Sequence, residues 1–395
     1  MRALGEVRAD PARRRIVFVG ADPAYLYAFR RPVMRGFVEH GWQVTAVAPE
    51  QAGFDTAVFQ NDGVRFVRWD IAKAALNPFQ ELRAFVSLVA ILRAERPDVL
   101  FAHTIKSVIY GMLAGALAGV PRRTAMIPGL GYAFLPGRGL KRALVGFVAR
   151  AGYRAALARA HLAIFQNRDD VATFRGLRLL GPRTEVGLVD GSGVDLTRFT
   201  PAAFPDGPPT FLMVARLLRD KGVYEFVEAA RLAKQRLPEA RFVLVGAADS
   251  NPAAVPQAQV DAWVAEGLIE ARGHLADPRE AFAAAHVFVL PSYREGTPRT
   301  NLEAMATGRA VLTTDVPGCR ETVTHGHNGL LVPVRDPQAL AEAMVELASD
   351  LERAEAMGRA GRKLCEDRYD VRTVSRATVR LLEGADEAAE LRKSA

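Results

Sequence analysis

Cysteine is scarce in this chain, which excludes a protein built on disulfide bonds. Cys319 and Cys365 are the two cysteines among 395 residues, so a reducing compartment, the cytoplasm, is the simpler expectation. Long apolar runs are missing too, because the longest, residues 107–120, is shorter than the roughly 20 residues that a membrane-spanning helix needs. Charged residues precede the first short apolar run, so the N-terminus does not resemble a secretory signal.

Acidic residues are missing from one long stretch, residues 99–168, although the whole chain carries 44 of them against 52 lysines and arginines. The net charge of +8 is modest for this length, but the stretch forms a field of one sign. Such a field attracts anions, which indicates nucleic acid, anionic lipid or a phosphorylated substrate as the partner. Its basic residues are Lys106, Arg122, Arg123, Arg138, Lys141, Arg142, Arg150, Arg154, Arg159 and Arg168.

Apolar runs of strand length alternate with helix-like segments along most of the chain. Continuous apolar strands separated by helices are typical of parallel sheets with both faces covered. In the first half the runs are 16–20, 44–48, 64–69, 99–102, 124–127, 162–165 and 186–189, with helical patterns at 25–39, 79–93, 108–117 and 140–158. After a proline-rich break at 201–209 the runs are 211–215, 242–246, 269–272, 287–290, 310–313 and 330–332.

This alternation predicts an α/β fold, with two doubly wound, Rossmann-like parallel-sheet domains facing across a cleft. We expect an N-terminal domain at 1–203 and a C-terminal domain at 204–370, with a last helix at 371–395 packing back on the first domain. The sequence has no clear pair of metal-binding aspartates and no Cys/His cluster, so we expect a site without a metal and no cofactor.

The densest candidate site is the segment 291–308, PSYREGTPRTNLEAMATG. It follows a buried strand, and we expect its helix to begin with Thr297 as N-cap and Pro298 as the first helical residue. A strand, a glycine-containing loop and a helix N-terminus together suit a bound phosphate, and Gly296 permits close approach of a ligand. Glu295 and Glu303 can accept hydrogen bonds from sugar hydroxyls; the alternative is two solvated surface glutamates.

A second candidate is the segment 214–222, VARLLRDKG. Arg216 lies at the tip of a strand and Lys221 opens the next helix, at the sheet edge where ligands bind in open α/β sheets. A guanidinium and an ammonium on one short loop suit a diphosphate. The alternative is a set of loop charges paired with Asp220 and Glu225.

Other candidates have a weaker signal. Each follows a predicted strand: Gly20 opens a loop, and His103 either makes a hydrogen bond in the cleft or is a satisfied structural histidine. The glycine-rich turns at 128–132 (PGLGY) and 191–195 (GSGVD) are tight turns that line the cleft or merely close it. His274 is a loop residue whose backbone can contact a flat base.

Segment 138–160 projects as a basic amphipathic helix. One side carries Leu140, Leu144, Phe147, Val148, Ala151 and Ala155, and the other Lys141, Arg142, Arg150, Arg154 and Arg159. This pattern is typical of a helix that binds an anionic membrane surface. The alternative, a core-packed helix with a solvated basic face, is equally compatible with the sequence.

The motifs EGTPRTNLEAMATGRAVLTTDVPGCRETV, VARLLRDKG and GSGVDLTRF resemble the family 4 retaining glycosyltransferases of the GT-B fold. The segment HTIKSVIYGMLAGALAGVPRRTAMIPGLGYAF is similar to the branch that extends lipid-linked sugars for bacterial capsule, O-antigen or glycan assembly. The resemblance covers about residues 16–369. It implies a nucleotide-sugar donor, with a UDP-sugar expected, on the C-terminal domain and a polyprenyl-diphosphate-linked acceptor on the N-terminal one.

The resemblance also implies roles for single residues. Arg216 and Lys221 match the diphosphate-binding pair, Glu295 the residue near the donor sugar and Glu303 the one that holds the ribose. Donor contacts are implied for Gly296, Thr297, Thr300, Asn301, Leu302, His274 and Gly20, and acceptor or cleft positions for His103, Lys106, Gly129, Gly131 and Tyr132. Many relatives have a donor-site histidine where this chain has Pro128 and Gly129, which leaves the role of His103 open.

The expected reaction is transfer of a hexosyl or N-acetylhexosaminyl group at the inner face of the plasma membrane, by a peripheral enzyme bound through 138–160. Two readings from other classes remain: a non-catalytic protein that binds membrane or nucleic acid on a relic GT-B fold, and a sugar-nucleotide epimerase. Nucleic acid is not the expected partner, because no interleaved aromatic platform or reading motif accompanies the basic stretch.

Overall fold

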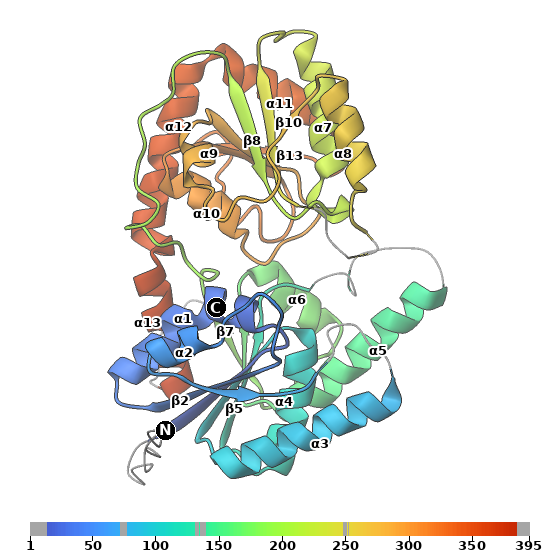
Figure 1. Ribbon diagram of the computed structural model, residues 1–395, viewed down its shortest axis with the longest axis vertical. Helices are drawn as coiled ribbons and strands as arrows, with labels where there is room; N and C mark the ends of the chain where they lie inside the picture. The colour runs from blue at the N-terminus through green and yellow to red at the C-terminus, as the bar shows by residue number, and fades with distance from the viewer. Residues whose placement is uncertain are drawn as a thin grey trace, which may run out of the picture.

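The computed structural model describes residues 14–71, 77–130, 134, 140–247, 251 and 253–384. Two parallel sheets lie one above the other, and helices cover both faces of each (Figure 1). The fold predicted from the sequence, two doubly wound parallel-sheet domains, is confirmed. The domain boundaries at 203 and 370 stay a prediction.

The N-terminal sheet has seven strands in the order β3-β2-β1-β4-β5-β6-β7, all parallel. Its strands are β1 (Arg15–Val19), β2 (Gln43–Ala48), β3 (Arg65–Arg68), β4 (Val99–His103), β5 (Arg122–Ile127), β6 (Leu162–Phe165) and β7 (Glu185–Leu188). The connecting helices are α1 (Pro23–Glu39), α2 (Ala57–Asn61), α3 (Pro78–Glu95), α4 (Ile105–Leu117), α5 (Leu140–Leu157) and α6 (Arg168–Gly176).

The C-terminal sheet has six strands in the order β10-β9-β8-β11-β12-β13, also parallel. They are β8 (Thr210–Val214), β9 (Arg241–Val245), β10 (Glu270–Ala271), β11 (Val287–Leu290), β12 (Ala310–Thr314) and β13 (Gly329–Val332). Its helices are α7 (Val223–Lys234), α8 (Gln257–Ala265), α9 (Arg279–Ala283), α10 (Arg299–Ala306), α11 (Pro337–Ser349) and α12 (Leu351–Leu364). The chain order reverses between β8 and β11, so ligands are expected at the carboxyl ends of these two strands.

The strands alternate their side chains between two cores. In β1, Val17 and Val19 face the core under α3, α4 and α5, whereas Ile16 and Phe18 face the core under α1 and α13 (Val371–Glu383). Because strand side chains alternate, α5 and α13 lie on opposite faces of the N-terminal sheet.

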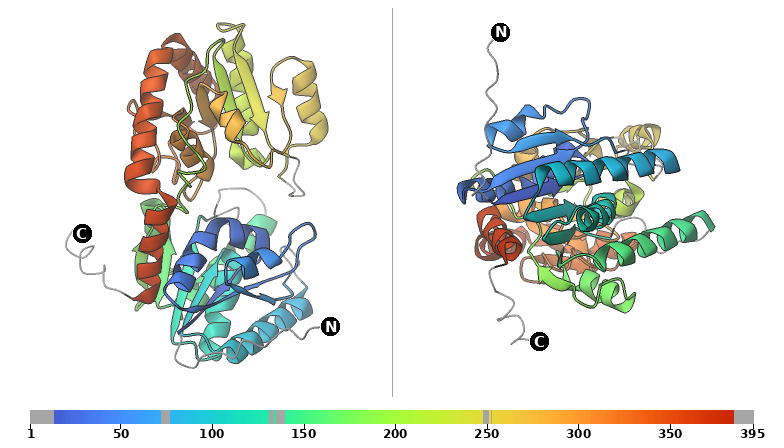
Figure 2. Two further views of the ribbon diagram at one scale, coloured as in Figure 1. Left: turned by 60° about the vertical axis from the view of Figure 1, so that its left-hand side comes forward. Right: turned by 90° about the horizontal axis from the view of Figure 1, so that it is seen from below.

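The C-terminal helix α13 joins the two halves. The chain leaves α12 in the C-terminal half, passes a π-helical turn at Cys365–Tyr369, and returns as α13 against α1 of the N-terminal half (Figure 2). The Arg122 guanidinium donates to the carbonyl of Leu381 and ties α13 to β5. Residues 385–395 of the expected last helix lie outside the described residues.

In the described structure the two cysteines form no disulfide bond. Cys319 and Cys365 are free and buried, and burial raises the pKa of each thiol to about 12. Both are therefore packed as apolar groups rather than poised as nucleophiles.

Candidate functional site

The loops after β8 and β11 bring the predicted cations and carboxylate together. Arg216 follows the end of β8 by two residues, and Lys221 ends a single 3₁₀ turn, Arg219–Lys221, before α7. Gly222 then has φ +78°, and a Cβ there would lie 2.1 Å from the carbonyl oxygen of Pro291. A glycine at this position therefore allows the β8 loop to lie directly against the β11 loop.

A cavity of about 510 Å³ opens where these loops face the N-terminal half. Both halves contribute to its lining, so it is the cleft expected from the sequence. The C-terminal half supplies Val214, Ala215, Arg216, Lys221, Leu290, Glu295, Gly296, Thr297, Pro298, Arg299, Thr300 and Leu302, and the N-terminal half Asp22, Tyr25, Phe29, Pro128, Gln166 and Ser192.

Lys221 and Glu295 form an ion pair in this cavity. The Lys221 Nζ donates to Glu295 Oε1 over 2.5 Å, with the two side chains 20% and 13% exposed. The alternative partners of the sequence reading are not used by Lys221: Glu225 instead accepts a hydrogen bond from the Tyr293 hydroxyl. The pair holds the ammonium at the carboxyl ends of β8 and β11.

The start of α10 differs from the prediction. Thr297 is not the N-cap: the helix begins at Arg299, and Pro298 is the N-cap with an extended ψ of 114°. The Thr297 hydroxyl donates instead to the carbonyl of Gln166 in the N-terminal half, over 3.3 Å. The sequence rule failed because this threonine has a partner across the cleft rather than in its own helix.

At Gly296 the two halves are in close contact. Its carbonyl accepts a hydrogen bond of 2.9 Å from the Asn167 side-chain amide. A Cβ on Gly296 would lie 1.6 Å from the carbonyl oxygen of Pro128, and a Cβ on Gly129 would lie 3.2 Å from the Gly296 nitrogen. The residues at 128 and 129, where many relatives have a histidine, therefore contact the donor-site loop through their backbone.

Glu303 does not line the cavity. It is buried in α10 and pairs with Arg299 over 3.0 Å. Burial raises the pKa of the Glu303 carboxyl, and the charge of Arg299 opposes that rise. Arg299 also donates to the carbonyl of Ala28, over 3.2 Å, and lies over the Phe29 ring. Arg299 therefore links Glu303 to α1 of the N-terminal half.

The carbonyl of Ala28 is available because of Pro32. A proline inside a helix has no N–H for the carbonyl four residues earlier, and Pro32 lies inside α1. Arg299 supplies the missing donor from the other half of the molecule. The hydrogen bond that Pro32 removes from α1 is thus replaced by a contact between the halves.

His103 lies beneath the cavity rather than in it. Its ring is buried and stacks on Tyr25, with centroids 5.1 Å apart. Within the described residues neither ring nitrogen has a hydrogen-bond partner, so His103 is not a satisfied structural histidine, and a hydrogen bond in the cleft stays a prediction. Burial and the charge of Arg30 hold the pKa of His103 well below its usual value. Arg30 is itself buried, and burial lowers its pKa to about 10.

Several other predicted residues lie outside the cavity lining. The Gly20 N–H donates to the carbonyl of Val47. Lys106 pairs with Glu81 over 2.7 Å, and the Asn301 side chain donates to Thr322. His274 is exposed after β10, and Gly131 and Tyr132 lie outside the described residues.

Sequence reasoning did not single out Gln166 of the lining, and it gave no role of their own to Tyr25, near the loop that Gly20 opens, or to Arg299, in the segment 291–308. Gln166 had a usable signal, because it directly follows β6 and the carboxyl ends of parallel strands share one edge. The contacts of Tyr25 and Arg299 could not be predicted, since these contacts depend on how α1 meets α10. Among the described residues no group of three or more His, Cys, Asp or Glu is placed to hold a metal; metal independence stays a prediction.

Comparison with known proteins decides the family. Residues 28–189 match the family "Glycosyl transferase 4-like domain", and residues 208–350 match "Glycosyl transferases group 1". The chain is 31% identical over 349 residues to the N,N'-diacetylbacillosaminyl-diphospho-undecaprenol alpha-1,3-N-acetylgalactosaminyltransferase of Campylobacter jejuni, covering 85% of this chain and 90% of that protein. The chain therefore belongs to the glycosyltransferases that combine these two domains.

A second relative of this glycosyltransferase is the UDP-Gal:alpha-D-GlcNAc-diphosphoundecaprenol alpha-1,3-galactosyltransferase of Escherichia coli, 27% identical over 289 residues, 70% of this chain and 72% of that protein. Among solved structures, sucrose-phosphate synthase from Thermosynechococcus elongatus superposes with a TM-score of 0.78 at 21% identity, over 97% and 100% of the two chains. The structure of HepE of Anabaena in complex with UDP-glucose superposes with a TM-score of 0.73 at 18% identity, over 94% of this chain and 99% of that chain. The family 4 resemblance, the GT-B fold and the glycosyltransferase activity predicted from the sequence are confirmed.

We predict that Gly296→Ala opens the glycosyltransferase without unfolding it. The atoms nearest to the added methyl all belong to the N-terminal half, Pro128 and Gln166, so each half keeps its own packing. Small-angle scattering is expected to show a larger radius of gyration, with the free energy of unfolding changed by ~1 kcal/mol or less. Gly176→Ala, with open space around its Cβ, is the control. An unchanged scattering profile for Gly296→Ala contradicts the closure contact.

We also predict an acid-sensitive stability from His103. The unfolded state protonates this histidine near its ordinary pKa of 6.5, and the folded state does not, because its folded pKa is depressed. Stability is therefore lost as pH falls below 6.5, by up to ~1.4 kcal/mol per pH unit for one proton. Urea unfolding between pH 7 and pH 5 measures the slope. In His103→Gln the slope of the free energy of unfolding against pH should decrease by the amount that one proton contributes. An identical slope in both proteins refutes the assignment.

Proposed function

We propose that this glycosyltransferase moves a sugar, with retention of configuration, from a nucleotide diphosphate sugar to a saccharide carried on polyprenyl diphosphate. The observation that carries the proposal is the convergence of Arg216, the Lys221–Glu295 pair and the Gly296 loop around one cavity between the halves. The two relatives above are named for undecaprenyl-diphosphate-linked acceptors, and the second also for a UDP-sugar. A UDP-sugar is the expected donor.

The hard step is the departure of the diphosphate while positive charge develops on the sugar. The bond between the anomeric carbon and the diphosphate oxygen breaks, the acceptor hydroxyl oxygen bonds to the same face, and its proton passes to the departing phosphate. Arg216 and Lys221 stabilise the negative charge that develops on the leaving group, and they are in place before the reaction begins. Glu295 orients Lys221 and faces the sugar end.

Closure of the two halves favours transfer of the sugar to the acceptor over hydrolysis of the donor. The Gly296 loop is covered by Pro128 and Asn167 of the N-terminal half. A covered donor site excludes water from the reacting centre and strengthens the charges inside it. Tyr25 and Asp22 line the N-terminal wall of the cavity, where the acceptor hydroxyl would enter. Burial raises the pKa of Tyr25, so it acts there as a neutral hydroxyl.

We propose that α5 holds the enzyme on the inner face of the plasma membrane. Its apolar stripe is not packed on the sheet: Leu144 and Phe147 are 62% and 63% exposed, with Val145 and Val148 exposed beside them. The buried face consists of other residues, among them Tyr153. Exposed apolar groups next to Arg150, Arg154 and Arg159 suit the boundary of an anionic leaflet.

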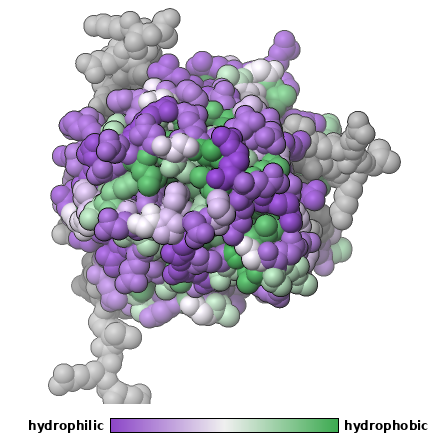
Figure 3. Space-filling view, turned by 90° about the horizontal axis from the view of Figure 1, so that it is seen from above, coloured by the Kyte–Doolittle hydropathy of each residue, from purple (hydrophilic) through white to green (hydrophobic). Residues whose placement is uncertain are grey.

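The end of the molecule opposite the N-terminal half offers no comparable apolar surface, which supports contact through the N-terminal half. The far end of the C-terminal half is mostly hydrophilic, with apolar residues in small groups (Figure 3). In the described part of the chain no helix is long and apolar enough to cross a membrane. Attachment through α5 makes the enzyme peripheral.

We predict that Arg216→Ala or Lys221→Ala lowers transfer by about 10³-fold, because each removes a charge that stabilises the leaving diphosphate. Arg219→Ala on the same loop is the control, since its guanidinium lies over Tyr224 at 4.9 Å and outside the cavity lining. Product analysis with a panel of nucleotide sugars and polyprenyl-diphosphate-linked acceptors measures the effect. Wild-type turnover in either variant contradicts the proposal. An isomerised nucleotide sugar without transfer supports the epimerase reading.

We predict that Leu144→Glu with Phe147→Glu weakens binding to vesicles of phosphatidylglycerol and phosphatidylethanolamine by more than about tenfold, because two inserted apolar groups are lost. Val264→Glu, an exposed apolar position on α8, is the control. Co-sedimentation measures the partition, and soluble-acceptor turnover should stay unchanged. Equal partition of the double variant and the wild type contradicts docking through α5.

A further inference from the structure

Tyr25 is an aromatic side chain of the N-terminal half that meets the charged end of the donor cavity. It lines this cavity together with Arg216, Lys221 and Glu295 of the C-terminal half. Burial raises the pKa of the Tyr25 hydroxyl, and the charges of Lys221 and Arg216 oppose that rise, so both cations lie within electrostatic reach of the hydroxyl. Tyr25 therefore faces the groups assigned above to the leaving diphosphate.

The Tyr25 hydroxyl is not used by the fold. The hydroxyls of Tyr27 and Tyr293 each donate a hydrogen bond to a carboxylate. Within the residues that the structure describes, the hydroxyl of Tyr25 makes no hydrogen bond, although the side chain is partly buried. A hydroxyl that lies at a cavity beside two cations, with no partner in the protein, is available to a bound anion.

The Tyr25 ring is fixed by its surroundings. It stacks on the buried His103 ring with centroids 5.1 Å apart, and it lies against the Phe29 ring at 4.2 Å. At the start of α1 the Tyr25 N–H donates to the side chain of the N-cap Asp22 over 3.0 Å. A donor that is held in position before the ligand arrives needs no reorganisation during the reaction.

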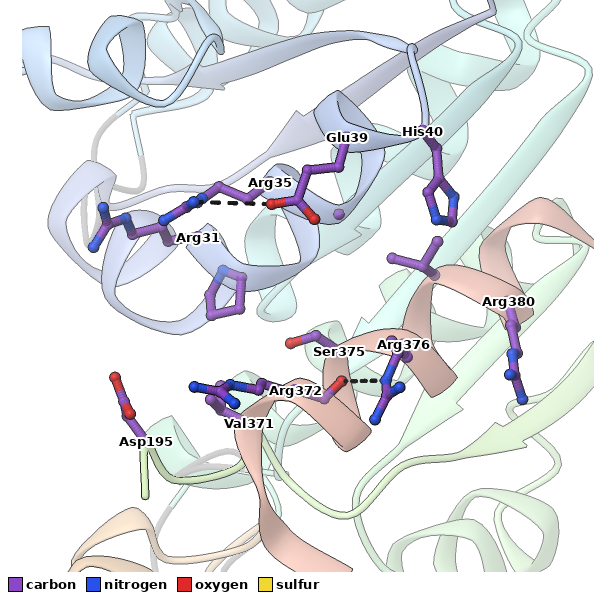
Figure 4. A pocket seen from close by; sticks show the side chains of 13 residues that line it. Arg31, Arg35, Glu39, His40, Asp195, Val371, Arg372, Ser375, Arg376 and Arg380 are labelled. Carbon is purple, nitrogen blue, oxygen red and sulfur yellow. Dashed lines mark hydrogen bonds and ion pairs between the residues drawn. The ribbon is translucent and has the colours of Figure 1, made fainter. Parts of the chain in front are cut away.

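The helix that carries Tyr25 is also held from its outer side. Figure 4 shows α1 and α13 side by side along a pocket, with Arg35 and Glu39 of α1 paired there. A Cβ on Gly36 of α1 would lie 3.1 Å from the Val379 side chain of α13, so the glycine permits close packing of the two helices. The contact with α13 therefore fixes α1, and with it the start of the helix.

Arg30 adds a buried positive charge near Tyr25. It is 2% exposed, and two of its nitrogens have no hydrogen-bond partner in the described structure. Burial lowers the pKa of Arg30 to about 10, so the group stays charged at neutral pH. A buried cation without a partner is costly to the fold. Its charge acts on the Tyr25 hydroxyl and strengthens that hydroxyl as a hydrogen-bond donor.

We propose that the Tyr25 hydroxyl donates a hydrogen bond to the departing diphosphate, as the contribution of the N-terminal half to leaving-group stabilisation. This inference rests on the transfer reaction proposed above. When the bond between the anomeric carbon and the diphosphate oxygen breaks, its electron pair stays on that oxygen. The acceptor oxygen bonds to the anomeric carbon, and the acceptor proton passes to the diphosphate.

Tyr25 keeps its own proton throughout this step. Its hydrogen bond strengthens as negative charge grows on the diphosphate oxygens, so the hydroxyl stabilises the transition state more than the bound donor. Arg216 and Lys221 come from the C-terminal half and Tyr25 from the N-terminal half. The complete set of hydrogen-bond donors is therefore assembled only when the two halves are closed.

Tyr25→Phe tests the proposal, because it removes the hydroxyl and keeps the ring. We expect kcat for transfer to fall about 10²-fold, while the KM for the nucleotide sugar changes by less than about threefold. Hydrolysis of the donor without acceptor should fall by the same factor, because both reactions need the diphosphate to leave. Tyr27→Phe is the matched control: it removes a hydroxyl from the same helix, but one that donates to Asp62, and should keep wild-type rates.

Three results would overturn the inference. Wild-type transfer by Tyr25→Phe, with Arg216→Ala inactive, contradicts the role of Tyr25 and leaves the proposed function standing. Slower transfer with unchanged hydrolysis would assign the hydroxyl to the acceptor instead of the leaving group. A higher KM for the nucleotide sugar with kcat unchanged would assign it to binding of the donor alone. Wild-type rates in both Tyr25→Phe and Arg216→Ala would instead contradict the proposed function together with this inference.

Discussion

The contact of the Gly296 backbone with the Pro128 carbonyl and the Asn167 side-chain amide is the constraint on which the site depends. Residue 296 has room for no side chain in the closed arrangement, and the carbonyl of the same residue is held by the other half. Because Gly296 takes part through its main chain alone, the contact brings the halves together without filling the space beside it. A cavity of about 510 Å³ therefore remains between two surfaces that touch at its rim.

Much of the fold and part of the site could be predicted from the sequence for one physical reason. Parallel strands are buried on both faces and end at a common edge, so apolar runs locate the strands and the next few residues locate the site. That rule found Arg216, Lys221 and Glu295. It placed Thr297 and Arg299 in the candidate segment 291–308 but gave no sign of their partners in the N-terminal half, because no local pattern encodes a contact between residues more than 100 positions apart.

The helix α5 shows a second limit of sequence reasoning. Its projection separated apolar from basic residues, but it gave no way to decide which face packs on the sheet. Packing is decided by Tyr153 and small residues such as Ala149 and Ala156, which fit against α4. The larger apolar residues are left outside, at positions that a core helix would bury. Burial thus followed shape at the contact rather than hydrophobicity.

Arg299 connects these features. It neutralises Glu303, which is buried in α10, and at the same time donates to the Ala28 carbonyl that Pro32 leaves without its helical partner. A buried carboxylate and an unpaired carbonyl are each costly alone, and one guanidinium satisfies both. Since the two groups belong to different halves, their needs are met together only when the halves are closed. The hydrogen bond missing at Pro32 therefore favours the same closed arrangement that covers the Gly296 loop. In this way a proline in a helix of the N-terminal half contributes to a site built on the C-terminal sheet.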